Sequence, residues 1–340
     1  MIGVSFGADD RSELRARLVS AFDSFHDVRP KDDKIIAELL RELEVDIAVD
    51  LMGHTRNARP GILACRTAPI QVNYLGYPAT MGADFIDYII ADPVVLPMDQ
   101  QRFYTEKIVH LPDSYQANDS KRKIAIPAPT RQQMGLPDSG FIFCCFNKNY
   151  KITPPIFDIW MRLLAVVENS VLWLLRSNRQ AEANLRREAS ARGIDPARLV
   201  FASPAEPEQH LARHKLADLF LDTLPYNAHT TASDALWSGL PLITCIGKSF
   251  AGRVASSLLS AIDLPELVTK SLPEYEALAL KLATDPSLLH SLRRRLEQNR
   301  STHPLFNSER FRRHIEAAYD TMWHFYQDGE APRSFRVPAI

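Results

Sequence analysis

Two lysines and a His-Thr-Thr triplet stand where they could bind phosphate. Lys148 and Lys151 follow the apolar segment 141–146, and the triplet at 229–231 follows the apolar segment 216–223. Short apolar segments of this kind are typical of strands in a parallel sheet, whose following loops meet at one edge. A helix that begins at that edge offers N–H groups without partners, which attract an anion, and lysine adds positive charge. The pattern therefore predicts a phosphate-binding site without a glycine-rich loop.

Each of these features also has a purely structural interpretation. Thr231 and Asp234 form the pattern T-x-x-D, which is typical of a capping box at the start of a helix. Surface loops often carry lysine for solubility alone. In the functional interpretation Asp234 instead binds a ribose hydroxyl, one turn into a helix expected over 232–238. Both interpretations stay open from the residues alone.

The amino-terminal part of the chain offers flexible backbone rather than charge. The stretches DLMGHTRNARPG and LGYPATMGADFIDY follow strand-like segments and contain glycines, which let the backbone approach a ligand closely. We predict that Leu75 and Gly76, which open the second stretch, contact the ligand. His54 is a candidate base, although a single loop histidine is more often simply exposed. No D-x-D pattern and no cluster with metal-ligand spacing occurs, so we expect no metal.

Apolar segments alternate with amphipathic ones, which predicts an α/β fold with parallel sheets. The segment 111–139 is rich in Pro, Asp, Ser and Arg and interrupts the alternation, as a linker does. We therefore place an amino-terminal Rossmann-like domain over 1–130 and a carboxyl-terminal one, with terminal helices, over 131–340. The expected strands cover 2–6, 45–52, 70–75, 85–92, 141–146, 170–176, 199–203, 216–223 and 240–246, and the main expected helices cover 10–22, 34–43, 60–65, 154–168, 179–193, 207–215 and 232–238.

Composition bounds the class of protein. The 340 residues are 46% hydrophobic and 24% charged, which suits about two globular domains. Forty basic and forty-one acidic residues leave a net charge of -1, so we expect no nucleic-acid partner. The absence of a signal sequence and of a long apolar segment predicts a cytoplasmic protein without a membrane partner. The four cysteines, Cys65, Cys144, Cys145 and Cys245, have no metal spacing, which fits a reducing compartment.

Five stretches together resemble, in order, the catalytic region of the O-GlcNAc transferase and SPINDLY family. They are VDLMGHTRNARPGILACRTAPIQVNYLGYPATMGADFIDYIIAD, FCCFNKNYKI, NSVLWLLRS, ADLFLDTLPYNAHTTASDALWSGLPLIT and HPLFNSERF. The resemblance implies the α/β fold of the GT-B type, two Rossmann-like domains facing a cleft. It also implies inverting, metal-independent transfer of GlcNAc from UDP-GlcNAc to Ser or Thr hydroxyls of an acceptor protein or peptide, with no cofactor.

The resemblance assigns roles to the matching positions. Lys151 resembles the lysine that contacts the donor's diphosphate, and Lys148 lies at a neighbouring donor-contacting position. The phosphate-binding triplet corresponds to His229, Thr230 and Thr231, and the ribose-binding acid to Asp234. The positions where the family binds uracil and ribose correspond to Ala205, Glu206, Pro207, His210 and Arg213.

Three departures from the family pattern shape our expectations. The chain has no tetratricopeptide repeats, and the segment that carries the family's catalytic histidine lies upstream of its first residue, so we expect donor binding with very weak transfer. Ala79 stands where the family has a glycine in its GYPGT loop. Two alternatives stay open: a SPINDLY-like O-fucosyltransferase that uses a GDP-sugar, which the loop 205–213 would distinguish, and a nucleotide-sugar-binding module without catalysis.

Overall fold

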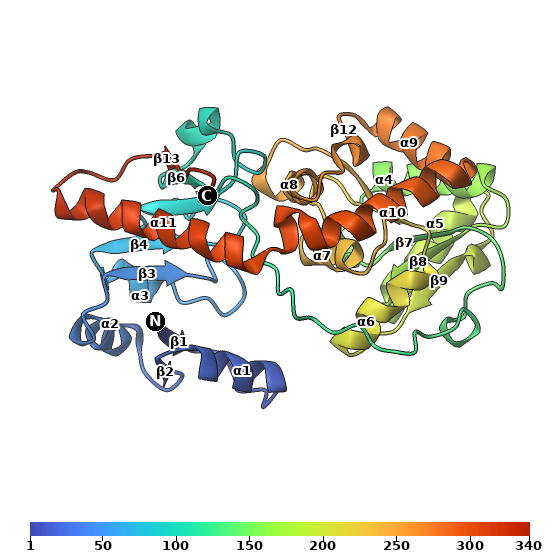
Figure 1. Cartoon of the computed structure of the whole chain (residues 1–340). Coiled ribbons are helices and arrows are strands. Elements are labelled where there is room, and N and C mark those ends of the chain that lie inside the picture. The colour runs from blue at the N-terminus through green and yellow to red at the C-terminus, as the bar shows by residue number, and fades with distance from the viewer. The chain divides into compact units, whose positions relative to one another are not determined.

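Most of the predicted apolar segments form strands of two parallel sheets in the computed structural model, which describes residues 1–340 (Figure 1). The larger sheet has the order β12-β11-β10-β7-β8-β9, and its strands all pair in parallel. Read from β9, this is the doubly wound order 3-2-1-4-5-6, with the change of direction between β7 and β10. Its strands are β7 (Ile142–Cys145), β8 (Val171–Leu175), β9 (Leu199–Ala202), β10 (Leu219–Leu221), β11 (Leu242–Cys245) and β12 (Val268–Thr269).

Helices connect these strands, and several begin as their sequences predict. Proline at the first position of α4 and α6 suits a helix start, because proline fixes φ and lacks an N–H that would have no partner there. Trp160 on α4 and Trp173 on β8 are among the largest fully buried side chains of this core. The helices are α4 (Pro154–Val166), α5 (Arg179–Ala191), α6 (Pro207–Arg213), α7 (Thr230–Trp237), α8 (Val254–Ala261), α9 (Leu272–Thr284) and α10 (Pro286–Thr302).

The second sheet has five strands in the order β13-β6-β5-β4-β3, and a separate two-stranded parallel sheet pairs β1 with β2. The strands are β1 (Ile2–Ser5), β2 (Ser24–Asp27), β3 (Ile47–Asp50), β4 (Ile70–Asn73), β5 (Tyr88–Ala91), β6 (Lys107–His110) and β13 (Phe335–Arg336). The accompanying helices are α1 (Glu13–Ala21), α2 (Asp33–Glu42), α3 (Gly61–Ala64) and α11 (Ser308–Gln327). The predicted α/β class of the GT-B type is confirmed.

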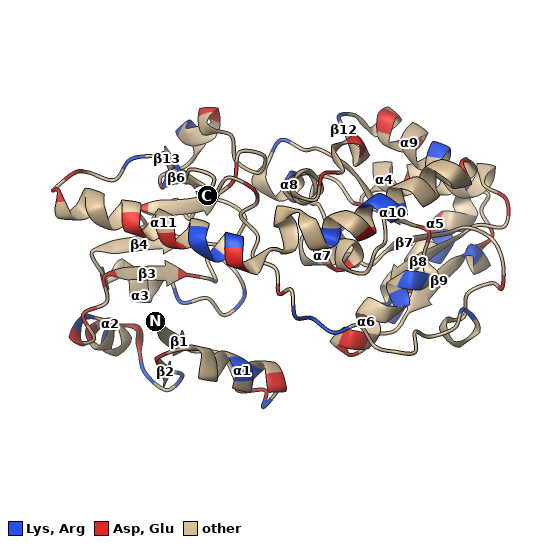
Figure 2. Cartoon of the chain, in the orientation of Figure 1, with Lys and Arg blue, Asp and Glu red and all other residues tan.

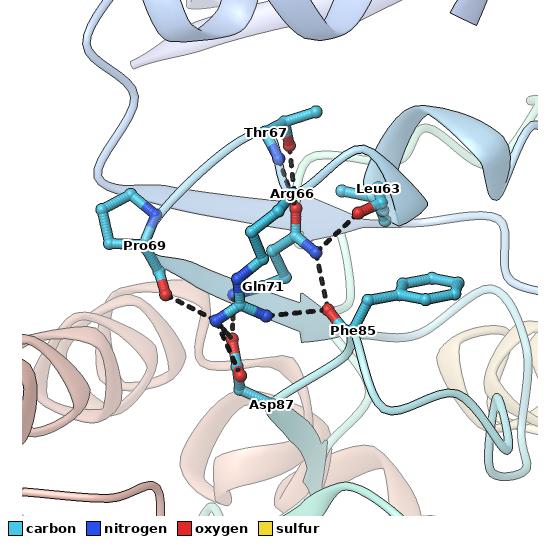
Figure 3. A network of polar contacts seen from close by, with 7 residues as sticks. All are labelled: Leu63, Arg66, Thr67, Pro69, Gln71, Phe85 and Asp87. Carbon is cyan, nitrogen blue, oxygen red and sulfur yellow. Dashed lines mark hydrogen bonds and ion pairs between the residues drawn. The ribbon is translucent and has the colours of Figure 1, made fainter.

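A network of hydrogen bonds and an ion pair links β4 and the segment before it to the residues that precede β5 (Figure 3). The buried Gln71 side chain accepts hydrogen bonds from the backbone N–H and the hydroxyl of Thr67, both at 2.9 Å, and donates to the carbonyl of Phe85 at 2.6 Å. Arg66 donates to both oxygens of Asp87, at 2.9 and 2.8 Å. Because its members bond mainly to one another, we interpret the network as structural.

The contacts divide the chain into two compact units. Each unit is made of several segments, so the division is not a single boundary near residue 130. Unit 1 comprises Met1–Ile90, Met98–His110 and Glu316–Arg336, and unit 2 comprises Ala91–Pro97, Leu111–Ile315 and Val337–Ile340. The predicted linker 111–139 belongs to unit 2. Within this unit, Asp92 accepts a hydrogen bond from the buried N–H of Tyr115 at 2.9 Å and from the hydroxyl of Ser257 at 2.7 Å.

The surface charge is mixed, in keeping with the balanced composition. Figure 2 shows basic and acidic residues together on α11, where Arg312 and Arg313 both bond to Glu309. None of the helices combines the length and the apolar character needed to cross a membrane.

Candidate functional site

The predicted phosphate-binding groups meet at the switch point of the larger sheet. Strand β7 leads into the short 3-10 helix Asn149–Lys151, and the adjacent strand β10 leads through residues 222–229 into α7. In doubly wound sheets, ligands bind at the carboxyl ends of the strands where the strand order reverses. The fold therefore places Lys151 and the His-Thr-Thr triplet at the expected position for a ligand.

Lys151 is held beside the loop that precedes α7. Its Nζ donates a hydrogen bond to the carbonyl oxygen of Asn227 at 2.8 Å and lies 4.0 Å from the ring centroid of Tyr226. Burial lowers the pKa of Lys151 to about 8, and the negative charge of Asp222 opposes that shift. Lys148, in contrast, is exposed. A partly desolvated ammonium is the stronger partner for a phosphate, because water screens it less.

Helix α7 begins without a side-chain cap. His229 occupies the N-cap position with φ -110° and ψ -94°, and no side chain bonds to the first N–H groups. Thr231 lies inside the helix, and its hydroxyl donates to Oδ1 of Asn147 at 2.5 Å, so the capping-box interpretation of Thr231 and Asp234 is wrong. The N–H groups of Ala232 and Ser233 donate to the carbonyl of His229, at 3.0 and 3.1 Å, so the N–H groups of Thr230 and Thr231 are the ones that lack a protein partner and suit an anion.

The imidazole of His229 stabilises this arrangement without adding charge. Burial lowers the pKa of His229 to about 4, so the ring is neutral at neutral pH. Its Nε2–H donates a hydrogen bond to the carbonyl oxygen of Ala251 at 3.1 Å, and the ring stacks on Tyr226 with centroids 4.8 Å apart. The positive potential at the site therefore comes from Lys151 and the helix start.

Asp234 lies on α7 between two basic side chains. Its Oδ1 accepts a hydrogen bond from Arg122 at 2.5 Å, and its Oδ2 lies 3.8 Å from Nε2 of His210. Burial raises the pKa of Asp234, and the Arg122 guanidinium partly offsets that effect. Arg122 belongs to the segment predicted as a linker. The structure thus brings Asp234 and His210 together, as expected for two groups around one ribose.

The loop between β9 and α6 carries the remaining predicted residues of unit 2. Ala205, Glu206 and Pro207 are exposed, and Pro207 begins α6. Arg213 is only 3% exposed; it bonds to Nδ1 of His210 and donates to the carbonyl of Ser203 at 2.7 Å. Arg213 therefore lies where it can hold this loop.

His210 is neutral and has a defined tautomer. Burial, assisted by the charge of Arg213, lowers the pKa of His210 to about 4. Because the Arg213 guanidinium donates to Nδ1, the proton resides on Nε2, on the side of Asp234. This leaves His210 Nε2–H available as a hydrogen-bond donor.

The candidates of unit 1 lie in two loops that pack against each other. A Cβ added to Gly76 would lie 1.9 Å from the carbonyl oxygen of Leu51, so only glycine fits there. Leu75 adopts a positive φ of 66°, and Nε2 of the exposed His54 lies 3.0 Å from the carbonyl oxygen of Met81. Gly76 therefore has a packing reason, and the ligand contacts of Leu75, Gly76 and His54 stay predictions.

A metal-binding group or a depression outside the predicted site could also bind a ligand. No group of three or more His, Cys, Asp or Glu side chains is arranged to hold a metal ion. An open depression of about 450 Å³ contains none of the predicted residues; it is lined by Arg176, Arg179, Glu182, Ala183 and Arg186. Arg176 and Arg186 both pair with Glu182, at 3.2 and 3.4 Å, so we interpret this depression as a surface ion-pair cluster.

Sequence reasoning missed five residues that shape the site: Arg122, Asn147, Asp222, Tyr226 and Asn227. One signal was available, because Asn147 and Asp222 follow two strand-like segments directly. Buried polar residues at the ends of adjacent strands need partners, and each is the nearest candidate for the other.

Comparisons with known proteins agree with this geometry. The model of glycosyl transferase family 41 matches residues 2–126 and 117–315. The chain is 40% identical over 339 residues to the probable UDP-N-acetylglucosamine--peptide N-acetylglucosaminyltransferase SEC of Arabidopsis thaliana, covering 98% of this chain and 35% of the relative. It is 37% identical over 324 residues to the corresponding SPINDLY protein of Oryza sativa subsp. japonica, covering 93% and 34%.

A solved structure gives the same result at the level of the fold. A mutant of the Thermobaculum terrenum O-GlcNAc transferase superposes with a TM-score of 0.87 at 32% identity, covering 95% of this chain and 61% of that one. The chain spans about a third of the length of the curated relatives that it matches. The matches to the family model and to these relatives extend over nearly the whole chain, which therefore belongs to glycosyl transferase family 41.

Proposed function

We propose that this chain is a glycosyltransferase that moves GlcNAc from UDP-GlcNAc to Ser or Thr hydroxyls of proteins, with inversion at the sugar and without a metal ion. The observation that carries the proposal is the uncapped start of α7 beside the half-buried Lys151. The printed names of the Arabidopsis and rice relatives describe peptide N-acetylglucosaminyltransferases that use UDP-N-acetylglucosamine, which supports the donor and the acceptor class.

Sugar transfer requires that the protein stabilise UDP as the leaving group. An acceptor hydroxyl attacks the anomeric carbon, the bond from that carbon to the β-phosphate oxygen breaks, and the hydroxyl proton passes to a base. Negative charge then develops on the departing UDP, where Lys151 and the first N–H groups of α7 would donate hydrogen bonds. Asp234 and His210 would hold the ribose, and the loop 205–213 would contact the uracil. His54 is the candidate base in unit 1.

A transfer assay in EDTA tests this function. We expect labelled GlcNAc to pass from UDP-GlcNAc to a peptide that contains Ser or Thr, and proton NMR of the product to show the anomer opposite to that of the donor. A requirement for added divalent cation would contradict metal independence, and a retained anomer would contradict inversion. Transfer from GDP-fucose and not from UDP-GlcNAc would replace the proposal with the O-fucosyltransferase alternative.

A further inference from the structure

We propose that Asn147 is a positioning residue for the diphosphate site and that it gives the two adjacent threonines of the triplet different roles. The inference rests on the proposed function, because it concerns how UDP is bound. Asn147 lies two residues after the end of β7 and is only 2% exposed, so it is not itself a surface for the ligand. Its side chain connects the end of β7 with the loop after β10 and with the first turn of α7.

The orientation of the Asn147 amide follows from the polarity of its partners. Nδ2 lies 2.8 Å from Oγ1 of Thr223 and 3.3 Å from Oδ1 of Asp222. Thr223 donates its own hydroxyl proton to the carbonyl of Tyr226 at 2.7 Å, so it can only accept from Asn147. The NH₂ group must therefore face Thr223 and Asp222, and the amide oxygen must face Thr231.

In this orientation the hydroxyl of Thr231 donates its proton in a hydrogen bond to Asn147. Oγ1 of Thr231 lies 2.5 Å from Oδ1 of Asn147, and an amide oxygen is only an acceptor, so Thr231 must be the donor. A hydroxyl has one proton, and that proton is no longer available for a phosphate oxygen. Thr230 is exposed at the first position of α7, so its hydroxyl is the one that can donate to the diphosphate, whereas Thr231 contributes its backbone N–H.

Asp222, which also bonds to Asn147, holds the loop that contacts Lys151. Asp222 is 1% exposed and accepts hydrogen bonds from the N–H of Thr223 at 2.7 Å, the N–H of Ala228 at 2.6 Å and the hydroxyl of Thr244 at 2.7 Å. These bonds fix both ends of the loop 223–228. Within that loop, the carbonyl of Asn227 accepts the hydrogen bond from Lys151.

The test compares UDP dissociation constants by calorimetry. Breaking the link from either side, with Asn147→Ala or Thr231→Val, should weaken UDP binding about tenfold or more, since either change removes the hydrogen bond that orders the helix start. Asn147→Ala should weaken it at least as much as Thr231→Val, because it also removes the bonds from Nδ2 to Thr223 and Asp222. Thr231→Ser keeps a hydroxyl donor and should bind as the wild type does. The double variant Asn147→Ala/Thr231→Val should be no weaker than Asn147→Ala alone, whereas Asn147→Ala and Thr230→Val should multiply their effects.

Asn299→Ala is the matched control, because Asn299 is also a buried asparagine of unit 2 and donates to the carbonyl of Ile262 at 2.8 Å, away from the site. It should lose stability and keep its UDP affinity. Should Asn147→Ala fail to fold, the comparison of Thr231→Val with Thr231→Ser decides alone. Wild-type affinity in Thr231→Val, or additive effects in the double variant, would overturn the inference while leaving the proposed function intact. Absence of UDP binding in the wild type would overturn both.

Discussion

Replacing Lys151 by Met is expected to lower kcat by about 10² to 10³ while changing the dissociation constant of UDP-GlcNAc much less. The negative charge on the β-phosphate grows as the sugar departs, so the Lys151 ammonium stabilises the transition state more than the bound donor. Methionine approximates the length of the lysine stem and adapts to irregular spaces, which preserves packing.

Initial rates for labelled transfer, combined with calorimetric donor binding, separate the two effects of this substitution. Lys281→Met on α9 is the matched control, because Lys281 is exposed on a helix of the same unit, and it should retain wild-type kcat. Equal losses in affinity and in kcat/KM, with kcat unchanged, would assign Lys151 to uniform donor binding and would contradict a role in the transition state.

The affinity for UDP, whose terminal phosphate already carries the charge that develops on the leaving group, is expected to fall above about pH 8, by up to tenfold for each pH unit. Burial lowers the pKa of Lys151 to about 8, so the free protein carries this positive charge below that pH and loses it above. A diphosphate favours the charged form, and binding at higher pH must therefore be accompanied by proton uptake. Lys151→Met should remove this dependence.

Calorimetry between pH 7 and pH 10, in two buffers of different ionisation enthalpy, measures both the affinity and the protons taken up. Three other ionisable groups near Lys151 do not titrate in this range. Burial lowers the pKa of His229 to about 4 and raises that of Asp222 to about 6, so both have titrated below this range. Burial raises the pKa of the Cys145 thiol far above it. A profile that falls equally in Lys151→Met would show that another group is responsible.

Much of the fold follows from local pattern. The fully buried strand β7 and the strands β8 to β11 of the larger sheet were predicted because continuous apolar segments are typical of parallel strands covered on both faces. The two-residue strand β12 of the same sheet was not predicted. The strands β2 and β6 were not predicted, since each has only four residues and carries polar ones. Helix α1 begins later than the expected range 10–22, because Ser12 is its N-cap and accepts the hydrogen bond from the N–H of Arg15.

Some residues of the candidate site could likewise be predicted from local sequence, and others could not. The triplet and Lys151 were predictable because each lies in the segment that follows an apolar strand and carries groups that can bind phosphate. Arg122 was not, because it belongs to a proline-rich stretch and meets Asp234 only through tertiary packing across 112 residues. Asn147 was likewise missed, since its importance comes from the Thr223 and Thr231 hydroxyls that the fold brings to it.

A crystal structure of the UDP complex, grown in EDTA, tests the central claim most directly. We expect β-phosphate oxygens within hydrogen-bond distance of Nζ of Lys151, of the hydroxyl of Thr230 and of the first N–H groups of α7, with the ribose beside Asp234. The hydroxyl of Thr231 should still donate to Asn147. A diphosphate bound elsewhere, for example among Arg176, Arg179 and Arg186, with the start of α7 left empty, would contradict the assignment of this site.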